Sequence, residues 1–169
     1  MKRIRLILCV VALFFFATSY GQNEKFKAMF IYNFTKYIEW PKAMRSGDFV
    51  IGVYGNSSVA AELQQIAAKQ KVGNQTIKIK ILDALADIKN CHILFISNSK
   101  SSSLVNILTN LGKANTLVVT EKDGLIRLGS GINFVMDGNK LNYEINKANI
   151  QKQGLTVSQS LLSLGIAVN

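Results

Sequence analysis

Residues 24–41 of the chain read EKFKAMFIYNFTKYIEWP, and this aromatic-rich stretch decides how the rest of the domain is arranged. Its apolar side chains recur at helical spacing, which predicts a helix with one almost wholly apolar face. That face consists of Phe26, Met29, Phe30, Phe34, Tyr37 and Ile38. Because Pro41 disfavours helical geometry at the residue before it, we expect the helix to end near Glu39 and Trp40 to pack against the domain.

Two polar residues, Asn33 and Lys36, lie on or beside the apolar face. Aromatic residues at this spacing usually belong to a core, so we expect the stripe to be covered. A polar side chain next to such a face needs a hydrogen-bond partner or water. Asn33 is therefore a candidate for contact with a ligand or a partner. Trp40 is a second candidate, because a ligand-binding module would place a pocket near it.

The beginning of the chain has the pattern of a secretion signal. Three basic residues precede an apolar run over residues 6–17, which is too short to span a bilayer, since a spanning helix needs about 20 residues. Small residues after the run offer a cleavage site. We expect residues 1–21 to be removed and residues 22–169 to form a single exported domain.

Charge and cysteine content limit the classes of function. Loss of the three basic residues of the signal lowers the formal net charge from +10 to +7. A basic exported domain favours anionic surfaces such as cell-wall polymers, whereas scattered basic residues and export both argue against nucleic acid. Only Cys91 remains after the signal is removed, so an intramolecular disulfide is excluded and an intermolecular Cys91 bridge stays open.

The middle of the chain alternates strand and helix patterns. Residues 49–54 are apolar on both faces, as in a central strand of a covered sheet, and a Gly-Asn-Ser turn then opens a helix expected to reach about Lys71. Alternating lysines in the next strand are typical of a sheet edge. The further strands are expected at residues 76–82, 91–97 and 116–120, with a helix through residues 104–111 ended by Gly112.

The pattern changes after Glu121. Strand patterns at residues 132–136 and 141–145 flank an Asp-Gly turn, which predicts an antiparallel hairpin, and two short helices follow at residues 147–153 and 158–164. The fold class is therefore α/β: a single layered domain with a mostly parallel sheet flanked by helices and an antiparallel C-terminal hairpin at its edge.

The side chains that support catalysis are few. His92 is the only histidine, and because strand residues alternate between faces, it points away from the neighbouring Cys91. One histidine and one cysteine cannot complete a zinc site, and the acidic residues are dispersed. We expect no enzymatic activity, no metal and no cofactor. His92 is open to two interpretations, a polar residue at a strand end or a pH-sensitive contact.

A polar set near the hairpin supplies the remaining candidates for a site. These residues are Arg127, Asn133, Glu144 and Asn146. One interpretation is structural: they set the hairpin register, and Asn146 caps the helix that follows. The other is a recognition surface in which Glu144 and Arg127 meet a polar ligand or partner.

Several of these segments together resemble the YfiR family of periplasmic regulators. In the first helix the resemblance is carried by Lys27, Ala28, Phe30, Ile31, Asn33, Phe34, Lys36, Tyr37, Ile38, Trp40 and Pro41. Later matches lie at residues 91–95, 131–133 and 143–146. The likeness extends from Lys25 to Gly165, which is essentially the whole mature chain.

The resemblance implies a non-enzymatic homodimer that binds the periplasmic sensor domain of an inner-membrane diguanylate cyclase and restrains it. That action would limit cyclic-di-GMP synthesis and biofilm formation, and the resemblance also implies association with peptidoglycan. The chain departs from the family in its cysteines, because the redox-tuning disulfides of the best-known member cannot form with Cys91 alone.

Three classes of function therefore have to be distinguished. An enzyme would need a pair of titratable side chains that converge in one cleft, and the sequence shows no such pair. Binding of a membrane sensor predicts an exposed apolar patch, for which residues 155–168 are a candidate. A small-ligand or peptidoglycan-fragment binding module instead predicts a pocket near Trp40 and Glu144.

Overall fold

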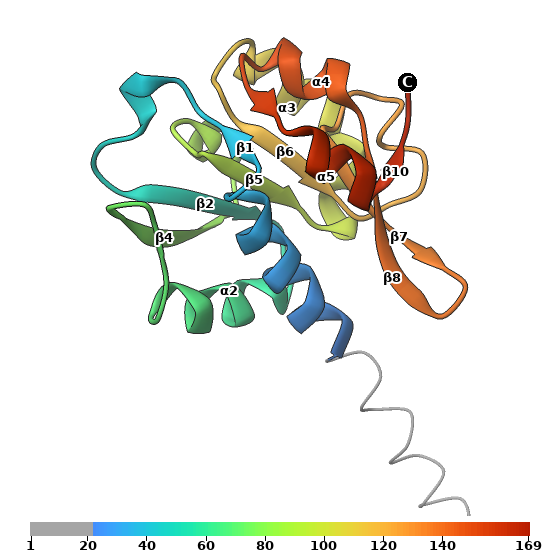
Figure 1. Cartoon of the computed structure of the whole chain (residues 1–169), viewed down its shortest axis with the longest axis horizontal. Helices are drawn as coiled ribbons and strands as arrows, with labels where there is room; N and C mark the ends of the chain where they lie inside the picture. The colour runs from blue at the N-terminus through green and yellow to red at the C-terminus, as the bar shows by residue number, and fades with distance from the viewer. Residues whose placement is uncertain (1–21) are drawn as a thin grey trace, which may run out of the picture.

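The computed structural model describes residues 22–169, and the predicted signal peptide at residues 1–21 lies outside the described residues. Within this range the centre of the molecule is an eight-stranded sheet in the order β10-β8-β7-β6-β5-β2-β4-β3 (Figure 1). Its strands are β2 Phe49–Tyr54, β3 Lys71–Val72, β4 Gln75–Leu82, β5 Ile93–Ile96, β6 Leu117–Thr120, β7 Ile132–Asp137, β8 Lys140–Ile145 and β10 Ile166–Ala167.

The sheet confirms the predicted α/β class. β4, β2, β5, β6 and β7 run parallel to one another, and β7 and β8 form the predicted antiparallel hairpin. A short strand that the sequence did not predict, β10, lies outside the hairpin and runs parallel to β8. The two-residue loop at Gly138 and Asn139 follows the Asp-Gly signal, since Gly138 adopts a positive φ of 59°.

Helices cover both faces of the sheet. One face carries the first helix (residues 22–34), α2 (Val59–Ala67), α4 (Lys147–Lys152) and α5 (Gln159–Leu164), which share one apolar core with it. The other face carries α3 (Leu104–Leu111) and the 3-10 segment η2 (Leu85–Ile88), over a second core. Two further 3-10 segments are η1 (Lys42–Met44) and η3 (Asn98–Ser103). No helix within residues 22–169 is both long and apolar enough to cross a membrane.

The first helix ends earlier than predicted, at residue 34 and not near Glu39. A tight turn follows, and Ile38–Glu39 then forms the short strand β1, which pairs antiparallel with β9 (Thr156–Val157). This pairing supplies hydrogen-bond partners for backbone groups that would otherwise be bonded within a longer helix. The Ser158 N–H likewise donates to Tyr37 O. Long-range pairing thus overrides the local helical pattern.

The first helix also turns a different face to the core than the sequence predicts. Ala28, Ile31 and Phe34 are buried, whereas Phe26 and Met29 keep 40% and 44% of their surface exposed. Part of the predicted apolar stripe is therefore left uncovered.

α2 likewise ends before the predicted position, at Ala67 and not near Lys71. The residues after it form β3, which pairs with the start of β4 across a turn at Gly73. Gly73 has a φ of 56°, a conformation that costs glycine little, so the chain reverses here instead of continuing as a helix.

Candidate functional site

Asn133 and Glu144 lie opposite each other in the register of the β7–β8 hairpin. Asn133 is fully buried. Its Nδ2 donates to Glu144 Oε2 at 3.0 Å, and its Oδ1 accepts from Thr120 Oγ1 at 2.7 Å. These contacts tie β6, β7 and β8 together on the face of the sheet that also carries α3. The structure thus brings these two predicted residues into contact.

The other two residues of the predicted hairpin set lie apart from this pair. The Asn146 side chain accepts from the Asn149 N–H at 2.9 Å, which confirms it as the N-cap of α4. Arg127 is exposed on the crossing from β6 to β7. No ion pair among residues 22–169 joins Arg127 to Glu144.

Trp40 is buried at the amino ends of the central strands, as its predicted packing against the domain requires. Its Nε1–H donates to His92 O at 3.1 Å, and its ring meets Phe49 edge-on with the ring centres 5.0 Å apart. Trp40 lines a cleft of about 280 Å³ together with Phe49 and Gln75, whereas Glu144 lies on β8, with β5, β6 and β7 between β8 and β2. The structure therefore does not bring these two candidates into one pocket.

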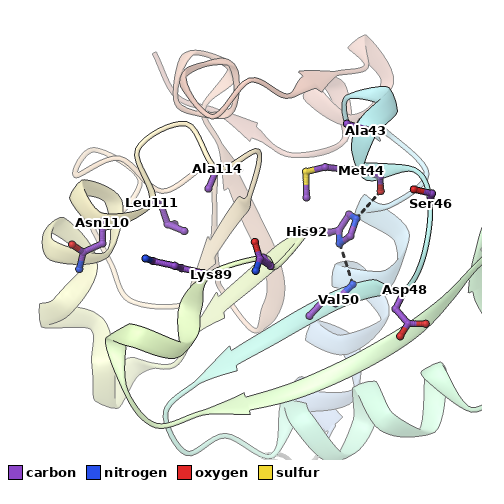
Figure 2. Close-up of a pocket in the computed structure, with 11 residues that line it drawn as sticks. Ala43, Met44, Ser46, Asp48, Val50, Lys89, His92, Asn110, Leu111 and Ala114 are labelled. Atoms are coloured by element: carbon purple, nitrogen blue, oxygen red, sulfur yellow. Dashed lines mark hydrogen bonds between the residues drawn. The ribbon is translucent and has the colours of Figure 1, made fainter.

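His92 lies immediately before β5, and its side chain links η1 to β2 (Figure 2). Its Nδ1 accepts from the Val50 N–H at 3.1 Å, which places the proton of the neutral ring on Nε2, and Nε2–H donates to Met44 O at 2.8 Å. The ring stacks on Phe49 at 4.3 Å. Burial lowers the pKa of His92, although the hydrogen bond to Met44 partly opposes this effect.

His92 also lines a cleft of about 640 Å³ between the η1 segment and α3. Figure 2 shows Lys89 and Asn110 across the cleft from His92, with Asp48 beyond Val50. Its lining combines the apolar side chains of Val50, Leu111 and Ala114 with charged side chains of both signs, Lys89 and Asp48. Such a site suits a small polar molecule.

Lowering the pH is expected to destabilise the protein through His92. The unfolded ring titrates near its ordinary value of 6.5, whereas the folded ring stays neutral to lower pH because its pKa is lowered. Below about pH 6.5 the unfolded state therefore binds more protons than the folded state, and the free energy of unfolding falls as the pH falls. Urea denaturation at about pH 7.5 and about pH 5.5 measures this loss.

The matched variant is His92→Asn, whose side-chain oxygen can still accept from the Val50 N–H but does not titrate. Its stability is expected to depend less on pH over the same interval. An equal dependence in both proteins would show that other groups cause the effect.

A partly buried ion-pair cluster holds the first helix against the carboxyl ends of β5 and β6. Lys27 Nζ lies 2.7 Å from Glu24 Oε1 and 2.6 Å from Glu121 Oε2, and Glu121 Oε1 accepts from the Asn98 N–H at 2.8 Å. Burial disfavours the charged ammonium, but the two carboxylates outweigh this and raise the pKa of Lys27. Sequence reasoning missed the cluster: the Glu24 spacing is visible in the sequence, but contact with Glu121, 94 residues away, is not.

A groove runs between the first helix and the hairpin, and we call it the helix–hairpin groove. It consists of two hollows of about 730 Å³ and about 270 Å³ that share Phe30. Its lining residues are Gln22, Asn23, Phe26, Phe30, Asn33, Phe34, Lys36, Tyr37, Met136, Asn139, Lys140, Leu141, Asn142, Tyr143, Leu161 and Leu164. Among the predicted site residues, Asn33 lies here, where its Oδ1 accepts from Lys36 Nζ at 2.9 Å.

Large apolar side chains are exposed on and around this groove. Phe26 on the helix is 40% exposed, Met136 on the hairpin 52% and Leu164 at the end of α5 63%. The predicted apolar patch at residues 155–168 is thus formed only in part, because Leu164 is exposed while Leu161 is buried in the core. The sequence pattern placed Phe26 in the covered stripe and so did not reveal the groove.

The fold and these surfaces define a small α/β domain with a partly apolar groove between its first helix and its hairpin. A model of the YfiR/HmsC-like family matches residues 24–166, and the chain belongs to this family. A search of curated proteins gives no match. Membership makes the chain a periplasmic regulator in general terms, of a family that interacts with periplasmic sensor domains.

Proposed function

We propose that this regulator binds the periplasmic sensor domain of an inner-membrane signalling protein, such as a diguanylate cyclase, and restrains it. The consequence would be lower cyclic-di-GMP synthesis and reduced biofilm formation. In this proposal the protein acts by contact and catalyses no reaction. The observation that carries the proposal is the helix–hairpin groove with its exposed apolar side chains.

The groove has the composition of a protein-binding surface. Phe26 and Met136 stand on its two walls with about half of their surface in solvent, and Phe30 lies between them at the floor. Exposed apolar patches rimmed by polar residues mark interaction sites. The rim here carries Lys36 and Lys140, and methionine adapts to the shape of a partner side chain.

The groove is also held in shape before a partner arrives. Lys27 fixes the amino end of the first helix through its two ion pairs. Phe30 and Phe34 both contact the Tyr143 ring edge-on, with ring centres 5.6 Å and 5.1 Å apart, so the helix is fixed against β8. A preorganised surface loses little conformational entropy on binding, which favours affinity.

The double variant Phe26→Ala/Met136→Ala is expected to weaken the complex with the sensor domain at least about tenfold, since apolar anchors carry most of the binding energy of an interface. Isothermal titration with the periplasmic domain of a candidate membrane sensor from the same organism measures the effect. The thermal unfolding midpoint checks that the variant stays folded.

Val105→Ala is the matched control. Val105 is 56% exposed on α3, on the opposite face of the sheet, so its loss is expected to leave the affinity unchanged. Equal weakening by the control, or full affinity in the groove variant, would contradict the role of the groove. The absence of any complex between the unaltered proteins would contradict the proposed function itself.

A second candidate function is the binding of a small ligand or a peptidoglycan fragment, and the cleft beside His92 favours it. Trp40 is the only tryptophan, and its ring centre lies 6.1 Å from that of His92, so its fluorescence reports on the cleft. A change in Trp40 fluorescence together with a raised melting temperature on addition of muropeptides would support this candidate. Unchanged values across such a panel would count against it.

We also propose that the protein is a homodimer, as the resemblance implies, and sedimentation of the purified protein tests this. An intermolecular disulfide is not part of the proposal. The Cys91 side chain is fully buried, and burial raises the pKa of its thiol, so the reactive thiolate is both scarce and inaccessible in the folded protein.

A further inference from the structure

The outer edge of β4 is open along most of its length. β2 pairs with β4 on the inner side from Ile77 to Leu82, whereas β3 covers only Gln75 and Thr76 on the outer side. In the sheet order of residues 22–169 nothing but this short β3 lies beyond β4, which forms the margin of the sheet in Figure 1. An open strand edge is a template for another strand.

The backbone groups that face outward can be assigned from the register. The Gly55 N–H donates to Leu82 O, so the backbone groups of Leu82 point toward β2. Because successive strand residues alternate in direction, the N–H and C=O groups of Ile77, Ile79 and Ile81 point away from the sheet. These residues offer a row of free donors and acceptors to an added strand.

The charged side chains along this edge are all positive. Residues 69–82 contain four lysines and no acidic residue. Lys78 and Lys80 are exposed, and no ion pair among residues 22–169 includes them. They share one face of the strand, while Ile79 and Ile81 share the other, and Ile81 is 59% exposed. The edge is therefore cationic on one face and apolar on the other.

We infer that the outer edge of β4 binds an extended acidic segment of a partner protein, which adds to the sheet as a further strand. The segment alternates acidic and apolar residues, because the side chains of an added strand face Lys78 and Lys80 on one side and Ile79 and Ile81 on the other. A second copy of this chain fits poorly, since its own lysines would meet like charges.

This surface is separate from the helix–hairpin groove. β4 and the hairpin lie toward opposite margins of the sheet, with β2, β5 and β6 between them. Binding at the β4 edge is therefore independent of the function proposed above, and its test does not use the sensor domain.

The test is a titration of the exported domain with the capped peptide Glu-Val-Glu-Val-Glu-Val, followed by amide hydrogen exchange. At saturation the exchange of the Ile79 and Ile81 amides is expected to slow at least about tenfold, because their N–H groups become hydrogen-bonded. The control peptide Glu-Glu-Glu-Val-Val-Val has the same charge without the alternation and is expected to leave these amides unprotected.

Two variants separate backbone pairing from charge attraction. Ile81→Pro removes an outward N–H at an edge position that tolerates proline, and it is expected to weaken binding at least about tenfold. Ile81→Thr keeps the N–H and the β-branch, so its affinity is expected to stay within about threefold. The double variant Lys78→Glu/Lys80→Glu is expected to lose the acidic peptide altogether.

The inference is overturned by any of three results. The first is no binding of the alternating peptide at millimolar concentration. The second is equal binding of both peptides without protection of the Ile79 and Ile81 amides, which would show simple charge attraction. The third is a homodimer that Ile81→Pro dissociates, which would show that the edge pairs with a second copy.

Discussion

Replacing Phe34 with alanine is expected to lower the free energy of unfolding by about 3–5 kcal/mol, the usual cost of removing a buried phenylalanine. Phe34 is 1% exposed at the centre of the larger core. Its ring lies 5.1 Å from that of Tyr143 and 6.1 Å from that of Phe134, so the loss leaves a cavity between the first helix and the hairpin. Urea denaturation at neutral pH measures the change.

Phe26→Ala is the matched control on the same helix. Because Phe26 is 40% exposed, its truncation is expected to cost less than about 1 kcal/mol. Similar losses for the two variants would contradict the assignment of the buried and open faces of the helix. The two variants also distinguish an effect on stability from an effect on binding. Of the two side chains, only Phe26 is exposed in the larger hollow of the groove, so its loss is expected to weaken binding more than stability.

Gly52→Ala is expected to destabilise the protein by about 3 kcal/mol, at the upper end of the usual cost of overpacking a core. Gly52 lies in β2, between β4 and β5 in the sheet. A Cβ atom there would approach Cys91 Sγ and Leu82 Cδ1 to 2.8 Å each, closer than van der Waals contact allows. The midpoint of urea denaturation reports the loss.

Cys91→Ala provides the control through a double-mutant cycle. Removal of Sγ relieves one of the two contacts, so the loss in Gly52→Ala/Cys91→Ala is expected to be smaller than the sum of the losses in the two single variants. Strict additivity would show that the two side chains do not compete for this space.

The elements that could be predicted from the sequence are those whose signal is local. β2 and β5 read as continuous apolar runs, the β7–β8 hairpin follows from one Asp-Gly turn, and the Asn146 cap follows from its place before α4. Contact between Asn133 and Glu144 then follows from hairpin register alone. In each case the residues that determine the structure lie within a few positions of one another.

The elements that were missed depend on distant partners. β1, β9 and β10 are two residues long, too short to carry a periodic pattern, and each exists because another strand lies beside it. The Lys27–Glu121 ion pair spans 94 residues. Trp40 and Glu144 were expected near one pocket. Trp40 packs against β2 and Glu144 lies on β8, however, and the strands β5, β6 and β7 lie between these two.

The sequence by itself determined the α/β class, the order of its main strands and helices, and the family, because hydrophobic period and turn residues act over short distances. Only the tertiary structure decided which side of the first helix is buried. The spacing of apolar residues in the sequence shows that one face of the helix is apolar, but it does not show how much of that face the rest of the chain covers. That coverage left Phe26 exposed, and with it the groove on which the proposed function rests.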